Sequence, residues 1–291
     1  MRSGVTITRT APRRRRLRIL LAAAGLLAAV AGCGGSRATA VTVKGSDTMV
    51  ILGQRWAEAF MAARKGAVIQ VTGGGSGTGF AALINGTTDV CQASRPIKDE
   101  ERQQMQTRFG APPQEIVVAR DGLAIYVHQD HPVKELSLAQ LKAIYTGQIQ
   151  GWAQVGGPAA PIVLYGRENS SGTYEYFKEH VLEKADFAAA VQTLPGTAAV
   201  VNAVARDPNG IGYGGAAYLK GVKEVAVRTD EAGEAFLPTA ENVRSGAYPI
   251  SRALFFYTRR APEGAMKAFV DFALSEAGQK LVTEVGYFPV Q

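Results

Sequence analysis

From residue 41 onward, short apolar runs alternate with longer amphipathic segments, a pattern that predicts an α/β protein whose strands are joined by crossover helices. The first strand is expected at 41–43, and Ser46 or Asp47 is expected to cap the helix that follows it. That helix repeats its apolar residues at spacings of three and four, in Met49, Leu52, Trp56 and Phe60. Further strands are expected at 68–71, 88–93, 116–119, 123–127, 161–165 and 254–258, a strand or turn at 210–215, and further helices at 80–84, 98–108, 137–145, 174–181, 197–206 and 265–275.

The first 32 residues have the pattern of an export signal rather than of folded structure. Arginines at 13–16 form a basic block, and an apolar run of about 15 residues follows, short for a membrane span. The run ends in Val-Ala-Gly-Cys, which resembles the bacterial lipobox, so Cys33 is expected to become the lipid-bearing first residue of the mature chain, with 33–40 as a flexible tether. An ordinary signal peptide with a coincidental cysteine is the alternative. The protein is therefore expected to be exported and anchored by lipid on the outer side of the cytoplasmic membrane or in the periplasm.

Removing 1–32 changes the electrostatic picture. This segment holds seven arginines and no acidic residue, so the formal net charge of +7 minus 7 leaves zero for the mature chain. The net positive charge of the full sequence thus comes from the export signal and gives no support for a nucleic-acid partner. Cys91 lies in an apolar stretch and is expected to be a buried structural thiol, and no disulfide is expected.

Three loops rich in glycine and hydroxyl residues each follow a predicted strand and open a predicted helix. They are Gly-Ser-Asp-Thr-Met at 45–49, Gly-Gly-Gly-Ser-Gly-Thr-Gly at 73–79 and Asn-Ser-Ser-Gly-Thr at 169–173. A helix N-terminus presents unpaired N–H groups, glycine lets the backbone approach a ligand, and hydroxyls donate further hydrogen bonds. One such loop could be a plain cap or turn. Three of them, with Arg167 just before the last, predict a clamp for a small oxyanion.

Enzyme and metal sites fit the same residues poorly. The loop at 73–79 lacks the ending of a nucleotide P-loop and does not match a dinucleotide fingerprint. Ser76 is not in a nucleophile elbow, because position 78 is Thr where glycine is needed. The only histidines are His128, His131 and His180, which offers few options for a catalytic triad. We therefore expect no catalytic activity, no metal and no cofactor.

Several landmarks in one order carry a resemblance to a known family. They are GSDTM, GGGSGTGFAALINGTTDV, ASRPIKDEE, LSLAQLKAIYTGQIQGWAQVGG, GRENSSGTYEYF and NGIGYGGAAY. In these the chain resembles the phosphate-binding proteins of bacterial phosphate ABC transporters, members of the periplasmic-binding-protein class. The resemblance implies a two-lobe, type II α/β fold with mixed, mostly parallel sheets, a hinge and a cleft between the lobes. Lobe one would combine 41–123 with 226–291, and lobe two would be 124–225.

The resemblance also implies which residues bind the anion. Thr48 would contribute its hydroxyl and Met49 its N–H group, with Ser76 and Ser94 as further donors from the first lobe. From the second lobe Arg167 would pair with the anion. The donors expected to close over it are Ser171, Gly172 and Thr173.

Two departures from the family pattern concern the ligand. Many members have an aspartate where this chain has Arg95, and that carboxylate accepts the proton of phosphate and repels fully ionised sulfate. Arg95 could instead be an extra anion donor or a charge that bridges the lobes. Asn169 stands where members often have aspartate, so Asp47, or less favourably Glu168, would have to supply an acceptor. A plain capping role for Asp47 is the alternative.

The sequence thus predicts a monomeric receptor that captures inorganic phosphate and delivers it to an ABC permease driven by an ATPase. The departures keep sulfate, molybdate and tungstate open as ligands. An exported phosphatase-like enzyme and an adhesion or sensory protein are the alternatives from other classes.

Overall fold

The computed structural model describes residues 1, 3, 4, 6 and 40–290. The lipidation predicted at Cys33, and nearly all of the predicted signal and tether, lie outside the described residues. The described residues from 40 to 290 form one compact unit. No helix in the described part of the chain is both long and apolar enough to cross a membrane.

The strands follow one another in the order β2-β1-β3-β10-β4-β8-β6-β7, and β9 pairs with β4 and β5 beside this path. The first half, which we call the first sheet, contains β1 (Val41–Gly45), β2 (Ile69–Thr72), β3 (Val90–Ala93), β10 (Ser251–Thr258) and the first part of β4 (Gln114–His128). Within it β1 is parallel to β2 and β3, whereas β10 is antiparallel to β3 and β4. The first sheet with its helices is the first lobe, and those helices are α2 (Val50–Ala63), α3 (Ser76–Asn85), α4 (Asp99–Phe109), α9 (Gly264–Leu274) and α10 (Glu276–Val285).

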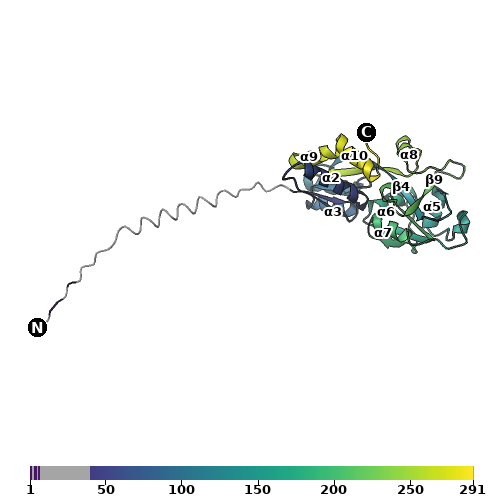
Figure 1. Cartoon of the computed structure of the whole chain (residues 1–291), viewed down its shortest axis with the longest axis horizontal. Coiled ribbons are helices and arrows are strands. Elements are labelled where there is room, and N and C mark those ends of the chain that lie inside the picture. The colour runs from purple at the N-terminus through teal and green to yellow at the C-terminus, as the bar shows by residue number, and fades with distance from the viewer. Residues whose placement is uncertain (2, 5, 7–39, 291) are drawn as a thin grey trace. The chain divides into compact units, whose positions relative to one another are not determined.

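The second sheet contains the rest of β4 together with β5 (Glu135–Ser137), β6 (Val163–Arg167), β7 (Gln192–Leu194), β8 (Gly210–Gly215) and β9 (Val222–Arg228). Strand β6 is parallel to β7 and β8, and β4 is antiparallel to β8 and β9. With α5 (Leu138–Tyr145), α6 (Gly172–His180) and α7 (Gly196–Val204) it forms the second lobe. The shorter elements are α8 (Ala240–Ser245) and the 3₁₀ turns η1 (Asp47–Met49), η2 (Trp152–Val155) and η3 (Ala216–Tyr218). Figure 1 shows α2, α3, α9 and α10 gathered together in one lobe, and α5, α6 and α7 in the other.

Strand β4 joins the two sheets without a break. The sequence pattern predicted two strands here, at 116–119 and 123–127, and that prediction is wrong. The polar residues Arg120 and Asp121 interrupt the apolar run, yet Arg120 pairs with Ala253 and bonds to Phe288, so the backbone stays extended. The strand pairs with β10 up to Gly122 and with β8 from Leu123 onward. Residues near 121–123 therefore lie where one lobe passes into the other.

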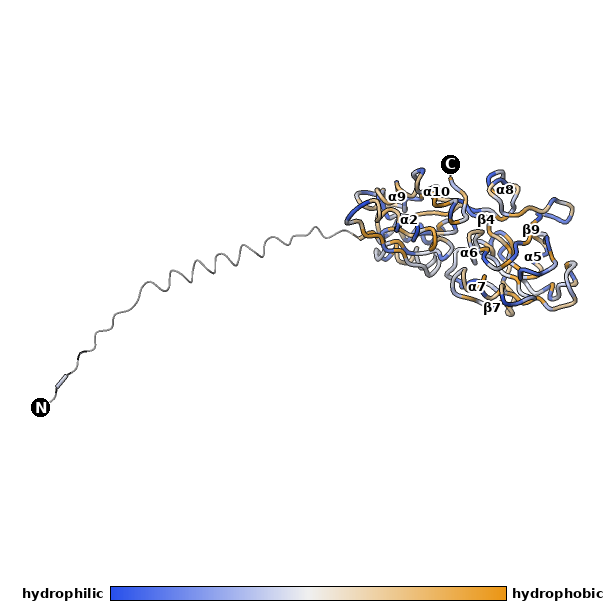
Figure 2. The backbone as a smooth tube through the Cα atoms, in the orientation of Figure 1, coloured by the Kyte–Doolittle hydropathy of each residue, from blue (hydrophilic) through white to orange (hydrophobic). Residues whose placement is uncertain are grey.

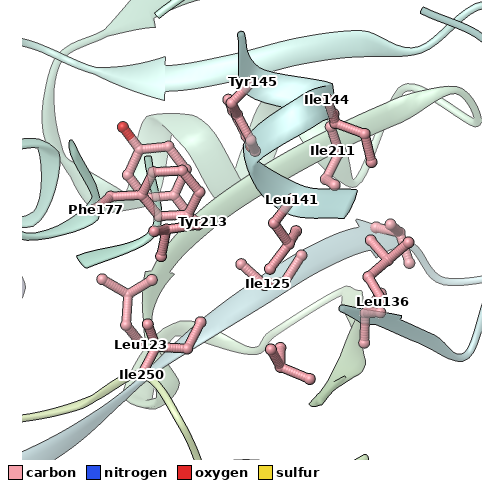
Figure 3. Close-up of a cluster of buried hydrophobic side chains, with 14 of the residues drawn as sticks. Leu123, Ile125, Leu136, Leu141, Ile144, Tyr145, Phe177, Ile211, Tyr213 and Ile250 are labelled. Atoms are coloured by element: carbon pink, nitrogen blue, oxygen red, sulfur yellow. The ribbon is translucent and has the colours of Figure 1, made fainter. Parts of the chain in front are cut away.

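Each lobe has its own hydrophobic core. In the second lobe, Leu123 and Ile125 of β4 pack with side chains from α5 and β8, and Figure 3 shows this cluster. Phe177 of α6 stacks on Tyr213 of β8, with ring centroids 4.1 Å apart. In the first lobe, Trp56 of α2 packs edge-on against a ring of β10. The loop after β9 is hydrophilic, and Figure 2 draws it largely in blue. The two-lobe α/β fold with mixed sheets is thus confirmed, while the residue boundaries assigned to the lobes stay a prediction.

Most predicted elements are present with shifted ends, and two long elements were missed. The helix expected at 80–84 begins earlier, at Ser76, and the chain after Ser275 forms a further helix, α10, that was not predicted. Strand β9 was also missed. Its sequence, VKEVAVR, alternates only partly between apolar and polar residues. Pairing with β4 and β5 stabilises it as a strand.

Candidate functional site

The three glycine- and hydroxyl-rich loops lie where the sequence predicted them, between a strand and the helix that follows it. The first joins β1 to η1 and α2, the second joins β2 to α3, and the third joins β6 to α6. The second and third loops meet, because Gly77 donates its N–H to the carbonyl of Ser170 at 2.9 Å. Gly75 has a φ of +92°, and a Cβ atom on it would collide with the same carbonyl, so only glycine fits there.

A cluster of buried hydroxyl groups lies at this meeting point. Thr48 and Thr173, from opposite lobes, have their Oγ1 atoms 2.8 Å apart. On the first-lobe side, Ser46 donates to Ser94 Oγ at 2.8 Å, and Ser76 Oγ accepts from the N–H of Ser94 at 3.1 Å. All five residues are 1% exposed or less. We call these five the hydroxyl cluster.

Gly172 lies against the same group. A Cβ atom at this position would collide with the hydroxyl oxygens of Ser76 and Ser94. The start of α6 therefore packs directly on the first lobe, and a larger residue at 172 would hold the two sides apart.

Three of the roles that the sequence predicted for residues of these loops are filled differently in the structure. The capping predicted for Ser46 or Asp47 is wrong, because neither side chain caps a helix N-terminus: the hydroxyl of Ser46 bonds to Ser94 and the carboxylate of Asp47 to other partners. The N–H of Met49 donates to the carbonyl of Ser46 at 3.1 Å. Ser171 caps α6, since its Oγ accepts from the N–H groups of Thr173 and Tyr174.

Arg167 ends β6 and is 2% exposed. Its Nη1 donates to Thr197 Oγ1 at 2.7 Å, and its Nη2 donates to Asp47 Oδ2 at 2.9 Å. The other carboxylate oxygen of Asp47 accepts from the N–H of Gly74. Burial lowers the pKa of Arg167, and the negative charge of Asp47 opposes that shift. The Nε atom of Arg167 is buried without a partner among the described residues, so this guanidinium still has a donor to offer.

Arg95 contacts a different set of groups. Its two Nη atoms donate to the carboxylate oxygens of Glu101 at 2.8 and 2.7 Å, and its guanidinium lies 4.7 Å from the ring centre of Phe80. Glu101 also accepts from the N–H of Lys98 at the start of α4. The structure thus places the Arg95 side chain against Glu101 of α4, bonded away from the hydroxyl cluster although Arg95 follows Ser94 in sequence.

Sequence reasoning missed a buried ion pair beside the cluster. Arg252 of β10 and Asp121 of β4 are cross-strand partners, and Nη2 of Arg252 lies 2.7 Å from Oδ2 of Asp121. The same Nη2 donates to Thr173 Oγ1 at 3.1 Å, and Nη1 donates to the carbonyl of Ser94 at 3.0 Å. A signal was present, because a buried charge needs a partner and each of these residues interrupts an apolar strand run. The sequence does not say that they pair with each other. Thr197, which accepts from Arg167, was also missed.

A hollow of about 680 Å³ opens beside the cluster, between the start of α4 and helix α6. Arg95 and Tyr176 line it, and the ion pair of Lys98 with Glu175, 2.9 Å apart, crosses it from lobe to lobe. No group of three or more His, Cys, Asp and Glu residues within the described ranges is arranged to hold a metal ion.

Comparisons with known proteins agree on one kind of relative. A family model described as a PBP superfamily domain matches residues 34–277. The phosphate-binding protein PstS of Pseudomonas aeruginosa is 39% identical over 264 residues, which cover 84% of this chain and 81% of that protein. The protein of the same name from Staphylococcus haemolyticus is 34% identical over 254 residues, covering 84% of this chain and 79% of that protein.

Solved structures give the same result. A Clostridium perfringens protein, described as a phosphate ABC transporter substrate-binding protein with bound phosphate, matches with a TM-score of 0.78. It is 33% identical, and the match covers 87% of this chain and 100% of that chain. An ABC-type phosphate transport receptor from Vibrio cholerae matches with a TM-score of 0.69 at 28% identity, covering 85% of this chain and 99% of that one.

Proposed function

The chain belongs to the phosphate-binding-protein family within the PBP superfamily, and from this membership and the hydroxyl cluster we propose that it captures inorganic phosphate for an ABC transporter. The resemblance seen in the sequence motifs is confirmed. The family consists of transport receptors that bind and release a solute, not of enzymes.

The observation that carries the proposal is the convergence of buried donors from both lobes. Thr48, Ser76 and Ser94 come from the first lobe, and Thr173 and Arg167 from the second. Hydroxyls that mostly bond to one another, next to a guanidinium with a spare Nε donor, are suited to a small ligand with many acceptor atoms. We propose that hydrogen phosphate takes this place, with Met49, Ser171 and Gly172 forming the adjoining backbone.

Selectivity for phosphate needs an acceptor for its proton. We propose that Asp47 has this role, since it lies next to Thr48 and its side chain is 19% exposed. Its bond to Arg167 leaves further lone pairs available. Arg95 would then act by holding α4 in place through Glu101 rather than by binding the anion. Sulfate, molybdate and tungstate remain the alternative ligands, because they need no acceptor.

Proteins of this family work outside the cytoplasm, and the finer placement is our proposal. Lipid on Cys33 would hold the protein, as a monomer, close to a membrane permease driven by a cytoplasmic ATPase. The lobes, taken as 41–123 with 226–291 and 124–225, would close on phosphate about a hinge at the crossing strand β4 and reopen at the permease.

Calorimetric titration tests the function. The purified protein without its export signal, stripped of anion by unfolding and refolding, is titrated with phosphate and then with sulfate at neutral pH. We expect phosphate to bind with a micromolar or lower Kd and sulfate to give no signal. Equal binding of both anions, or binding of sulfate alone, would contradict the proposal and show that the ligand has changed with Arg95.

A further inference from the structure

Arg252 has contacts that the sheet itself does not require. Strand β10 is already bonded on both sides, to β3 and to β4. The Arg252 side chain is nevertheless 1% exposed and reaches three separate groups: the carboxylate of Asp121, the carbonyl of Ser94 and the hydroxyl of Thr173. The first two lie in the first lobe and the third in the second. A buried guanidinium is costly unless its hydrogen bonds are made, so these three partners define what the residue does.

The bond from Arg252 occupies one acceptor position of the Thr173 hydroxyl. A guanidinium can only donate, so Thr173 Oγ1 must accept from Nη2 of Arg252. The hydroxyl keeps its own proton and a second lone pair for another partner. That partner is Oγ1 of Thr48, 2.8 Å away and in the opposite lobe, and either oxygen can be the donor. An anion offers only acceptor atoms, so Thr173 has to donate to it, and the bond from Arg252 favours this polarity because it fills one acceptor position of the hydroxyl.

Asp121 holds Arg252 in this orientation. Its Oδ2 accepts from both Nε and Nη2 of Arg252, at 3.0 and 2.7 Å. Its Oδ1 accepts from the N–H of Ala216, which follows β8 in the second lobe. Burial raises the pKa of Asp121, and the guanidinium of Arg252 opposes that shift. The pair is therefore bonded to both lobes at the place where β4 passes between them.

We propose that Arg252 is a positioning residue of the anion site: it orients the hydroxyl of Thr173 as a donor and, with Asp121, ties α6 to the first lobe when the lobes are closed. This inference rests on the proposed binding of a small tetrahedral oxyanion. Because the bond to Thr173 joins the two lobes, it stabilises the closed arrangement and acts mainly on release. Residues that donate hydrogen bonds directly to the anion, by contrast, determine its own contacts with the protein.

The test uses inorganic phosphate as the probe. Phosphate affinity and dissociation rate are measured for the wild-type protein, Arg252→Gln, Thr173→Val and the double variant. We expect Arg252→Gln to bind phosphate about tenfold more weakly, with most of the change in the dissociation rate. In the Thr173→Val background the same substitution should cost less than about twofold, because the hydroxyl that Arg252 orients is gone.

Arg228→Gln is the matched control. Arg228 is another largely buried arginine, paired with Glu135 at 2.6 Å and with Glu231 at 2.9 Å, and it does not touch the hydroxyl cluster. We expect this variant to bind phosphate as the wild type does. If Arg252→Gln does not fold, the paired substitution Arg252→Met with Asp121→Leu replaces it, since exchanging both charges for apolar groups removes the unpaired buried charge.

The outcomes separate this inference from the proposed function. A folded Arg252→Gln protein that binds phosphate within about twofold of wild type, or whose loss is fully additive with Thr173→Val, overturns the positioning role alone. A wild-type protein that does not bind phosphate overturns the proposed function, and this inference with it. Non-additive loss in Arg252→Gln, with Arg228→Gln unchanged, supports the inference.

Discussion

Arg167 and Arg252 are both buried beside the hydroxyl cluster, and each pairs with an aspartate, yet the two aspartates are placed differently. Asp121 lies directly across from Arg252 on the neighbouring strand of the same sheet. Asp47 comes from the opposite lobe to Arg167. Opening of the lobes would therefore separate Arg167 from Asp47 and leave Arg252 with Asp121. The first lobe carries a preset ion pair, whereas the second obtains its carboxylate partner only on closure, which couples the charge at the site to the conformation.

Exposure separates the two pairs further. The side chain of Asp121 is fully buried, and that of Asp47 is 19% exposed. A carboxylate with some freedom can interact with a ligand, while a fully bonded and buried one can only orient its neighbours. Arg167 and Asp47 are thus suited to contact the ligand, and Arg252 and Asp121 to orient their neighbours.

The largest effect is expected at Arg167. Arg167→Ala removes a donor to the anion and leaves Asp47 as an unpaired charge near it, so phosphate affinity should fall more than tenfold, at about 1.5–3 kcal/mol for a hydrogen bond to a charged group. Calorimetric titration measures the loss, with Arg228→Ala as the control. Normal phosphate binding by Arg167→Ala would contradict the proposed anion clamp.

Selectivity should change at one aspartate and not at the other. Asp47→Asn removes the carboxylate that repels fully ionised sulfate, so the affinity for sulfate relative to phosphate should rise about tenfold. Asp121→Asn should change both affinities in the same direction and leave their ratio within about twofold, because Asp121 acts only through Arg252. Competition titrations with both anions give the two ratios. An unchanged ratio in Asp47→Asn would mean that Asp47 only orients Arg167.

Arg95 is a third buried arginine, and it is bonded outside the cluster. Arg95→Gln breaks its paired bonds with Glu101, at a cost of about 2 kcal/mol for hydrogen bonds to a charged group, and should lower Tm by about 4–8 °C. Phosphate affinity should stay within about threefold of wild type. Thermal unfolding and titration of the same preparation separate the two effects. A loss of affinity as large as that of Arg167→Ala would make Arg95 part of the anion site.

Glu224 is a half-buried carboxyl whose pKa is shifted by burial alone. Burial raises its pKa from 4.5 to about 7. A carboxyl whose pKa is higher in the folded chain stabilises the fold while protonated, and this contribution is lost as the pH rises from 4.5 through 7. Glu224→Gln cannot ionise, so its Tm should lie close to wild type at pH 4 and exceed it by about 5 °C at pH 8, which corresponds to about 1.7 kcal/mol after discounting for the partial exposure of Glu224.

Thermal unfolding at the two pH values measures this difference, and the exposed Glu234→Gln is the control. The same gap in Tm at both pH values would show that the pKa of Glu224 is not raised in the folded chain.

The parts of the site that the sequence could predict are those held by local structure. The loop at 73–79 and the stretch from Arg167 to Thr173 combine glycines, hydroxyls and a strand end within a few residues, so composition alone points to them. Asp121 and Arg252 lie 131 residues apart, and only the pairing of β4 with β10 brings them together. The continuity of β4 was missed for a related reason, because a buried ion pair interrupts its apolar pattern.

The sequence also could not show where each hydroxyl points. Ser46 and Ser171 have the same capping chemistry at the start of a helix, yet Ser171 caps α6 and Ser46 donates to Ser94 instead. The difference arises because β1 and β3 are neighbours, which puts Ser94 within reach of Ser46. Tertiary contact therefore decides between two roles that are equivalent in sequence.

A crystal structure of the protein grown with phosphate would show which side chains hold the anion. We expect the anion between the two lobes, within hydrogen-bonding distance of Thr48, Ser94, Thr173 and Arg167, with Arg252 bonded to Thr173 and Asp121 rather than to phosphate. Phosphate in the hollow beside Arg95 and Tyr176, or bound directly by Arg252 with Arg167 remote from it, would contradict the account.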